Sequence, residues 1–280
     1  ARGGTPDAAA AEAGDALATG LAAILADANL DPAFKALALQ IPGEQDLLGH
    51  LGAEVDPDAV SAAVKGLRAE LGDRLAGPLV AAYEAHVAPE PYEPSARSAG
   101  LRSLRNTALD LLAAAGGDDA AERAWRHFED AGNMTDRFAA LSTMVANGLP
   151  RREEALAAFG ERYGDEPLVL DKWFAVQARA PLPDALDRVI ALKSHPGYAE
   201  RNPNRLRALV GTFAHQNLTQ FNRADGAGYR FVADEVIALD RRNPQVAARL
   251  LAAFRSFRMM EAGRRARARA ELERVAATAE

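Results

Sequence analysis

The stretch PSARSAGLRSLRNTALDLLAAAG, residues 94–116, shows the helical pattern of this chain in its clearest form. Its apolar positions recur at intervals of three and four and therefore share one face of an α-helix. These positions are Leu101, Leu104, Ala108, Leu111 and Leu112. The pair Gly116-Gly117 then ends the pattern, as glycine does after many helices. We expect an amphipathic helix here that buries its leucine face.

The same pattern continues on both sides in shorter units. Upstream, it predicts a helix over 7–28, two short helices within 31–52 separated by Pro42-Gly43, and a helical hairpin over 56–88. We expect this hairpin to break near Gly72, with Asp73 starting its second half. Downstream, the predicted helices cover 118–131, 134–147, 151–163, 166–180, 184–193, 203–215, 227–240, 244–256 and 258–278.

Four Asx-Pro pairs mark helix starts: Asp31-Pro32, Asp56-Pro57, Asn202-Pro203 and Asn243-Pro244. The Asx side chain suits the N-cap, and proline suits the first helical position, where its missing N–H costs nothing. Asn133 is expected to cap another helix entrance. These helix-start signals indicate many short helices.

Composition agrees with an all-α fold. Hydrophobic residues make up 49% of the chain and aromatic residues only 6%, so Ala, Leu and Val must build the core. Short loops between singly amphipathic helices favour stacked helical hairpins, an irregular α-superhelix of the ARM/HEAT kind. We expect one domain over 1–280, with residues 1–6 disordered.

Composition also limits the functions that are open to the chain. It has no cysteine, which excludes disulfides, thiolate zinc sites and a cysteine nucleophile. Its net charge of −6 argues against general nucleic-acid binding, and no apolar run is long enough for a membrane span. We expect a cytoplasmic protein. The start at Ala1, without methionine, is what an excised fragment or a processed chain would have.

The sequence offers no catalytic or metal-binding pattern. Its histidines do not form a His-Glu-x-x-His motif, and no two lie three or four residues apart, as a helical zinc site requires. We expect them to be surface or packing residues: His50, His86, His127, His195 and His215. A Gly-x-Ser-x-Gly elbow and a phosphate loop are also missing.

Two charged segments have both a functional and a structural interpretation. The seven arginines between Arg255 and Arg274 could contact nucleic acid, but we favour a solvated helix face with pairs such as Glu261–Arg265. Lys172 beside Asp171 could be a catalytic pair. We favour a structural ion pair that holds one helix to the next.

Several polar motifs, taken in order, resemble a known family. They are Ile41-Pro-Gly-Glu44, Arg102-Ser-Leu-Arg-Asn106, Asn133-Met-Thr-Asp136, Leu170-Asp-Lys-Trp-Phe174, Asn202-Pro-Asn-Arg-Leu-Arg207, Asp225-Gly-Ala-Gly-Tyr229 and Asn243-Pro-Gln-Val-Ala-Ala-Arg249. Together they resemble the carboxy-terminal domain of bacterial aminopeptidase N, a zinc metallopeptidase. The resemblance runs over essentially the whole chain and is strongest from Asn133 to Leu250.

The resemblance implies a helical domain that closes over a zinc domain and encloses the active-site chamber. The family's Gly-Ala-Met-Glu-Asn motif and zinc helix are absent from this chain. The chain would therefore have no catalytic residue or metal of its own, with zinc held by the parent's catalytic domain. Its partners would be that catalytic domain and peptide substrates, and the isolated chain would be inactive.

The resemblance also implies three substrate-binding residues, Arg207, Gln245 and Arg249. The residue pattern is compatible with this role. Arg207 lies off the core stripe of helix 203–215, beside small residues, and Gln245 and Arg249 share a face of helix 244–256 with Ala252 and Ser256. The pattern alone favours an ordinary exposed face, and only together with the resemblance are the two interpretations evenly balanced.

A different class of function stays open. A stand-alone helical solenoid would bind a protein partner through an exposed patch on its concave surface. Recovery of one specific partner at native stoichiometry would distinguish it from a peptidase domain. A nucleic-acid binder that uses the terminal arginines is a third and weaker alternative.

Overall fold

The computed structural model describes residues 6–87, 92–199 and 201–278. Helices account for the regular structure of these residues, apart from an isolated parallel bridge between Val55 and Met260. The all-α fold class is confirmed. Of the amino-terminal segment expected to be disordered, residues 1–5 lie outside the described part, and α1 begins at Pro6.

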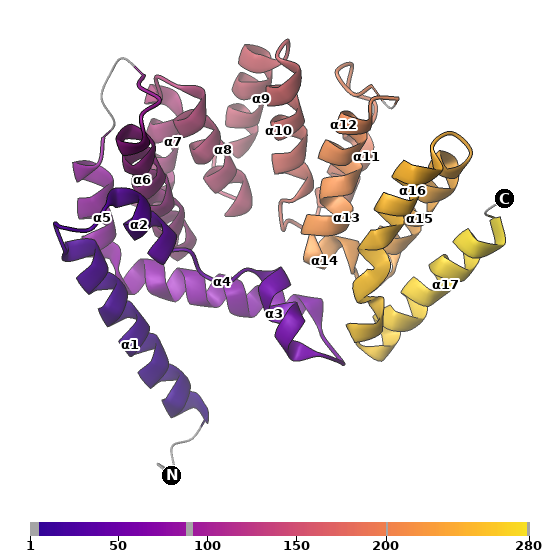
Figure 1. Cartoon of the computed structure of the whole chain (residues 1–280), viewed down its shortest axis with the longest axis horizontal. Coiled ribbons are helices and arrows are strands. Elements are labelled where there is room, and N and C mark those ends of the chain that lie inside the picture. Colours follow the sequence, from indigo (N-terminus) through magenta and orange to yellow (C-terminus); the bar gives the residue numbers. More distant parts are fainter. Residues whose placement is uncertain (1–5, 88–91, 200, 279–280) are drawn as a thin grey trace. The chain divides into compact units, whose positions relative to one another are not determined.

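Contacts divide the chain into two compact units (Figure 1). Unit 1 comprises residues 1–42 and 64–155, and unit 2 comprises residues 43–63 and 156–280. The boundary after residue 42 precedes α3 (Glu44–Leu51), and the other two fall inside α4 (Pro57–Arg74) and α9 (Arg152–Tyr163). Each unit is described by itself below, and the assignment of 1–280 to one domain stays a prediction.

Unit 1 is organised around α6, which packs against α2, α5, α7 and α8. The long leucine-rich segment of the sequence forms this helix, and Leu104, Leu109 and Leu111 are almost completely buried. Its elements are α1 (Pro6–Ala26), α2 (Pro32–Ala38), α4 (Pro57–Arg74), α5 (Ala76–Ala85), α6 (Ala96–Ala115), α7 (Asp118–Asp130), α8 (Met134–Ala146) and the start of α9 (Arg152–Tyr163).

The break expected near Gly72 falls slightly later, at Leu75. Helix α4 continues through Gly72 to Arg74, and α5 starts at Ala76 with Pro78 in its first turn. A Cβ atom on Gly72 would lie 2.2 Å from the carbonyl oxygen of Leu111. The glycine therefore allows α4 to approach the backbone of α6 closely, and it does not end a helix.

Unit 2 is a succession of packed helices along the chain (Figure 1). Its elements are α3 (Glu44–Leu51), the first turns of α4, most of α9, α10 (Pro167–Ala178), α11 (Ala185–Leu192), α12 (Pro203–Leu206), α13 (Thr212–Gln216), α14 (Leu218–Phe221), α15 (Ala227–Asp240), α16 (Pro244–Leu251) and α17 (Ala262–Thr278). The sequence did not indicate the short helix α14.

A backbone bridge ties the early segment 43–63 to the late helices of unit 2. The Val55 N–H donates to the Met259 carbonyl at 2.8 Å, and the Val55 carbonyl accepts from Glu261 N–H at 2.9 Å. Met260 adopts an extended conformation to form this bridge, with φ −66° and ψ 155°. The last helix therefore starts at Ala262, later than the expected residue 258.

Two predicted helices are less regular than expected. The segment 203–215 contains a π-helical turn, Arg207–Gly211, between α12 and α13. Its signature is the Thr212 N–H, which bonds to the Arg207 carbonyl five residues back, and the Thr212 hydroxyl bonds to the same carbonyl at 3.3 Å. The helix predicted over 244–256 changes after Leu251 into a 3₁₀ helix, Ala252–Met259.

The predicted caps are confirmed. The Asx side chains before the four prolines each accept a backbone N–H two or three residues ahead, at 2.7 Å for Asp31 and 2.9 Å for Asp56. The corresponding distances are 3.0 Å for Asn202 and 3.2 Å for Asn243. Asn133 caps α8 by accepting from Asp136 N–H at 2.9 Å.

Candidate functional site

The three predicted binding residues lie on exposed surface of unit 2. Arg207 is the first residue of the π turn, and its Nη2 donates to Asn204 Oδ1 at 2.9 Å. Gln245 and Arg249 are both exposed on α16, one helical turn apart. All three are therefore accessible to a ligand.

The helices that carry these residues lie beside each other, because they line the same two hollows. Pro203 and Leu206, at the start of one helix, share a cavity of about 290 Å³ with Asn243 and Val246, at the start of the other. Farther along both helices lies a second cavity of about 150 Å³. Neighbouring residues of the same helices form these cavities, but Arg207, Gln245 and Arg249 themselves line neither of them.

Small side chains form much of the second cavity, which we call the lower groove. It is lined by Ala214 from α13 and by Ala252 and Ser256 from the 3₁₀ helix. The sequence placed these same small residues one or two turns beyond Arg207 and Arg249. His215 and Arg255 add polar groups at this groove. Such a surface has space and hydrogen-bonding groups for part of a polar ligand.

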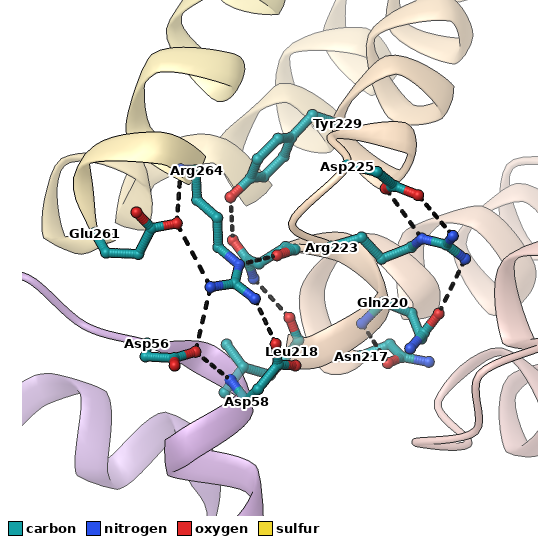
Figure 2. A network of polar contacts seen from close by, with 11 residues as sticks. Asp56, Asp58, Asn217, Leu218, Gln220, Arg223, Asp225, Tyr229, Glu261 and Arg264 are labelled. Carbon is teal, nitrogen blue, oxygen red and sulfur yellow. Dashed lines mark hydrogen bonds and ion pairs between the residues drawn. The ribbon is translucent and has the colours of Figure 1, made fainter.

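A polar network centred on the buried Arg264 holds the elements behind this groove (Figure 2). The Arg264 Nε donates to the Asn222 carbonyl at 2.6 Å, and Nη1 lies 3.2 Å from Asp56 and 3.5 Å from Glu261. Its Nη2 pairs with Asp58. One guanidinium therefore joins α17 to the segment before α15 and to the start of α4.

Two further side chains complete this Arg264 network. The Tyr229 hydroxyl donates to Asn222 Oδ1 at 2.8 Å, and Asn222 Nδ2 donates to the Leu218 carbonyl at 2.8 Å. Burial raises the pKa of Tyr229. Both polar ends of the Asn222 amide and the Tyr229 hydroxyl are thus hydrogen-bonded inside the protein.

An exposed ion pair stands beside the network (Figure 2). The Arg223 guanidinium donates to both carboxylate oxygens of Asp225, at 3.2 and 2.7 Å, and to Gln220 at 3.4 Å. Hydrogen bonding from Arg223, followed by the Ala227 N–H, lowers the pKa of Asp225 to about 2. This bidentate ion pair stabilises the turn that leads into α15.

Sequence reasoning missed the role of Arg264. The arginine-rich tail was expected to be a solvated face, whereas Arg264 is only 5% exposed. Arg265 pairs with Glu54 at 2.8 Å and not with Glu261, whose carboxylate accepts the N–H groups of Gly263 and Arg264. The spacing could have indicated that Arg264 is buried, because it shares a helix face with the buried Ala268 and Val275.

The carboxylate beside Lys172 forms an ion pair between helices. Asp171 pairs with Arg205 of α12, which also donates to the carbonyls of Pro167 and Gly197 at 2.9 Å. This pair joins α10 to α12 and has a structural role.

Comparison with known families identifies the domain. Residues 4–280 match DUF3458_C, a domain of unknown function that consists of ARM repeats. The chain belongs to the DUF3458_C family. This match confirms the helical-repeat class that the stacked hairpins predicted.

Relatives of this DUF3458_C domain are much longer proteins. The chain is 44% identical over 260 residues to aminopeptidase N of Caulobacter vibrioides, covering 93% of the chain and 30% of that protein. It is 36% identical to aminopeptidase N of Escherichia coli, covering 90% of the chain and 29% of that protein. The chain thus spans less than a third of these relatives, and its resemblance to a domain of aminopeptidase N is confirmed.

A solved structure agrees with these relatives. Aminopeptidase A of Legionella pneumophila, in a crystal structure with aspartic acid, has a TM-score of 0.82 and 26% identity. The match covers 92% of the chain and 31% of that protein. The fold of the DUF3458_C domain is therefore also that of part of this enzyme.

The structure gives one family motif a physical role. In Asp225-Gly-Ala-Gly-Tyr229, Gly226 has a positive φ of 75°, and a Cβ on Gly228 would lie 2.3 Å from the Gln220 carbonyl oxygen. The motif therefore lets α15 start directly against α14. It holds Tyr229 in the Arg264 network.

Two findings on the DUF3458_C chain concern metal sites and membrane spans. Within the described residues, no group of three or more His, Asp or Glu side chains could hold a metal ion. None of the helices described is long and apolar enough to cross a membrane.

Proposed function

We propose that this chain is the carboxy-terminal domain of a zinc aminopeptidase that removes N-terminal residues from peptides. The observation that carries the proposal is the alignment of more than 90% of the chain with aminopeptidase N of C. vibrioides, of which it covers 30%. In the parent enzyme, zinc in the catalytic domain would polarise the scissile carbonyl and activate water. This domain would enclose the chamber and bind the peptide without supplying a catalytic group.

The exposed residues of unit 2 suit the binding role. A peptide held at the zinc by its amino end presents its other end, a carboxylate, to the enclosing domain. Arg207 and Arg249 can pair with such a carboxylate in a bidentate fork, and Gln245 can supply a neutral hydrogen bond. The lower groove, with small residues at its wall, lies farther along the helical segments that carry these side chains.

The test is Arg249→Ala in the full-length enzyme, with two substrate lengths. A short peptide with a free carboxyl end should lose roughly tenfold or more in kcat/KM, because a hydrogen bond to a charged group contributes about 1.5–3 kcal/mol. A single-residue amide substrate, too short to reach Arg249, should be unaffected. The matched control is Arg269→Ala, an exposed arginine of α17 that pairs with Glu273 on its own helix.

Each alternative result has a definite meaning. Equal loss for both substrates assigns Arg249 to folding, and no loss for either removes it from the binding site. Metal analysis and a chromogenic peptidase assay on the 280-residue chain provide a second test. Stoichiometric zinc with turnover in that chain would overturn the division of roles between the two domains.

A further inference from the structure

A further polar hollow is lined entirely by residues of unit 1. We call it the Tyr83 cavity; its volume is about 720 Å³, and α5, α6, α7 and the start of α8 contribute to its wall. Four arginines and four acidic residues line it, so their formal charges cancel. The size fits a small organic ligand, and the balance of charges favours a ligand that carries both signs.

Two motifs that carry the family resemblance meet at this cavity. Asn106, which ends the Arg102-Ser-Leu-Arg-Asn106 motif, donates to Asp136 Oδ1 at 2.9 Å. Asn133 donates to Asp136 Oδ2, also at 2.9 Å. Both oxygens of the buried Asp136 carboxylate are thus hydrogen-bonded, and this part of the wall is fixed without a ligand.

Two buried nitrogen atoms of residues that line the cavity have no hydrogen-bond partner within the described part of the chain. His127 is 4% exposed, and among the residues that the structure describes its Nε2 has no hydrogen-bond partner. The same holds for Nε of Arg105. The Tyr83 hydroxyl connects the two residues, lying 3.0 Å from His127 Nδ1 and 3.4 Å from Arg105 Nη2. Both unpaired donors therefore belong to side chains that contact one hydroxyl.

The proton positions follow from the chemistry of these groups. Arg105 can only donate to the Tyr83 oxygen, so the hydroxyl proton is available for Nδ1 of His127. Burial, followed by the charge of Arg105, lowers the pKa of His127 to about 4, and burial raises the pKa of Tyr83. The imidazole is therefore neutral at pH 7, and when the Tyr83 hydroxyl donates to Nδ1 the imidazole proton lies on Nε2. That nitrogen needs an oxygen acceptor.

The geometry points to a ligand with a carboxylate. We propose that the Tyr83 cavity binds the carboxylate of a zwitterion, a free amino acid or a short peptide, through Arg105 and His127, with its ammonium group toward Asp119 and Asp130. Both of these aspartates line the cavity and are exposed, whereas His127 is buried. A carboxylate would supply acceptors for both unpaired donors, and the exposed acids would pair with the opposite charge.

The cavity wall has further features that suit such a ligand. The guanidiniums of Arg105 and Arg123 lie 4.6 and 5.1 Å from the Tyr83 ring centroid, so two cations contact this ring. Val87 and Tyr92 provide apolar surface for a side chain. This binding would occur in unit 1, far along the sequence from Arg207 and Arg249, and it does not depend on peptidase activity.

Isothermal titration calorimetry on the 280-residue chain tests the site with three probes: L-leucine, L-leucylglycine and L-leucinamide. We expect saturable binding of leucine or leucylglycine at one site per chain, and the tighter of the two identifies the source as amino acid or peptide. Leucinamide, which lacks the carboxylate, should bind roughly tenfold or more weakly. No saturable binding at millimolar concentration, or leucinamide binding as tightly as leucine, overturns the proposal.

Two variants test whether the probe binds in the Tyr83 cavity. Arg105→Gln and His127→Phe should each weaken the bound probe roughly tenfold or more. The matched control is Arg97→Gln, which removes the same charge from an exposed position two turns earlier on α6. Circular dichroism establishes that each variant is folded. Unchanged affinity in both cavity variants places the ligand elsewhere and contradicts the proposal, and if Arg105→Gln does not fold, His127→Phe decides.

Discussion

The Arg264 network of unit 2 and the Tyr83 cavity of unit 1 contain similar side chains in different states. Each has a buried tyrosine that is hydrogen-bonded to a buried polar residue, and each has an arginine at hydrogen-bonding distance from this group. In the Arg264 network, the three nitrogens of the guanidinium find carbonyl or carboxylate oxygens. In the Tyr83 cavity, Nε of Arg105 and Nε2 of His127 have no partner among the described residues.

This difference separates a structural role from a binding role. A buried polar group without a partner costs about 1–3 kcal/mol, so a site with two of them beside a cavity is stabilised by whatever supplies the acceptors. A network whose donors are all paired has no such need and serves to join helices. The same residue types therefore join helices in the Arg264 network and form a candidate binding site in the Tyr83 cavity.

The largest expected effect comes from removing Arg264. In Arg264→Met the Asn222 carbonyl loses its charged donor and Asp56 and Asp58 lose their partner. We expect a loss of about 3 kcal/mol in the free energy of unfolding. Urea unfolding followed by circular dichroism measures it. The matched change Arg269→Met, at an exposed ion pair, should cost about 0.5 kcal/mol or less; equal losses would contradict the structural role of Arg264.

The next effect concerns the pH dependence of stability. His127 has a pKa of about 4 when folded and an ordinary value near 6.5 when unfolded. Between these values the unfolded chain binds the proton and the folded chain does not, so stability is full above pH 6.5 and falls as the pH decreases toward 4. The difference is at most about 3 kcal/mol.

The variant His127→Gln isolates this contribution, because glutamine does not titrate. Unfolding free energies of the original and the variant should be measured at several values of pH from 7 to 4. We expect the decrease toward acid to be steeper in the original protein. Parallel curves would show that His127 takes up its proton as readily in the folded state as in the unfolded one.

The smallest expected effects on stability compare the Arg264 network and the Tyr83 cavity most directly. Tyr229→Phe removes the donor to Asn222 Oδ1 inside a fully paired network and should cost about 1–2 kcal/mol. Tyr83→Phe removes a hydroxyl that bonds to the buried His127, but the adjoining cavity has room for a water in its place, so the change should cost about 0.5 kcal/mol or less. Thermal unfolding of the two variants tests this order, and the reverse order would mean that the Tyr83 cavity is the more tightly integrated region.

Local features were predictable from the sequence. Helix positions follow from apolar spacing, and the caps at Asp31, Asp56, Asn202 and Asn243 follow from Asx-Pro pairs, because both depend on residues within one or two turns. The exposed positions of Arg207, Gln245 and Arg249 agree with their place off the apolar stripes. Their role in substrate binding stays a proposal.

Features that depend on distant contacts were not predictable. Gly72 looked like a helix break because the approach of Leu111 cannot be read locally. Arg264 looked exposed because its partners Asp56 and Asp58 lie more than 200 residues earlier. The Tyr83 cavity was missed because Tyr83, Arg105 and His127 come from three helices, although the motifs ending at Asn106 and Asp136 had drawn attention to two of its walls.

The π turn at Arg207–Gly211 has a consequence for insertions and deletions in this domain. A π turn is an α-helix with one additional residue, and each residue of an α-helix turns its successor by about 100°. Deleting one residue within this turn would leave a longer regular helix and rotate Arg207 by about that angle relative to Ala214 at the lower groove. A homologue that lacks the extra residue of this turn would have a regular helix here. It would therefore present a different side chain at the position of Arg207, even where every other residue is the same.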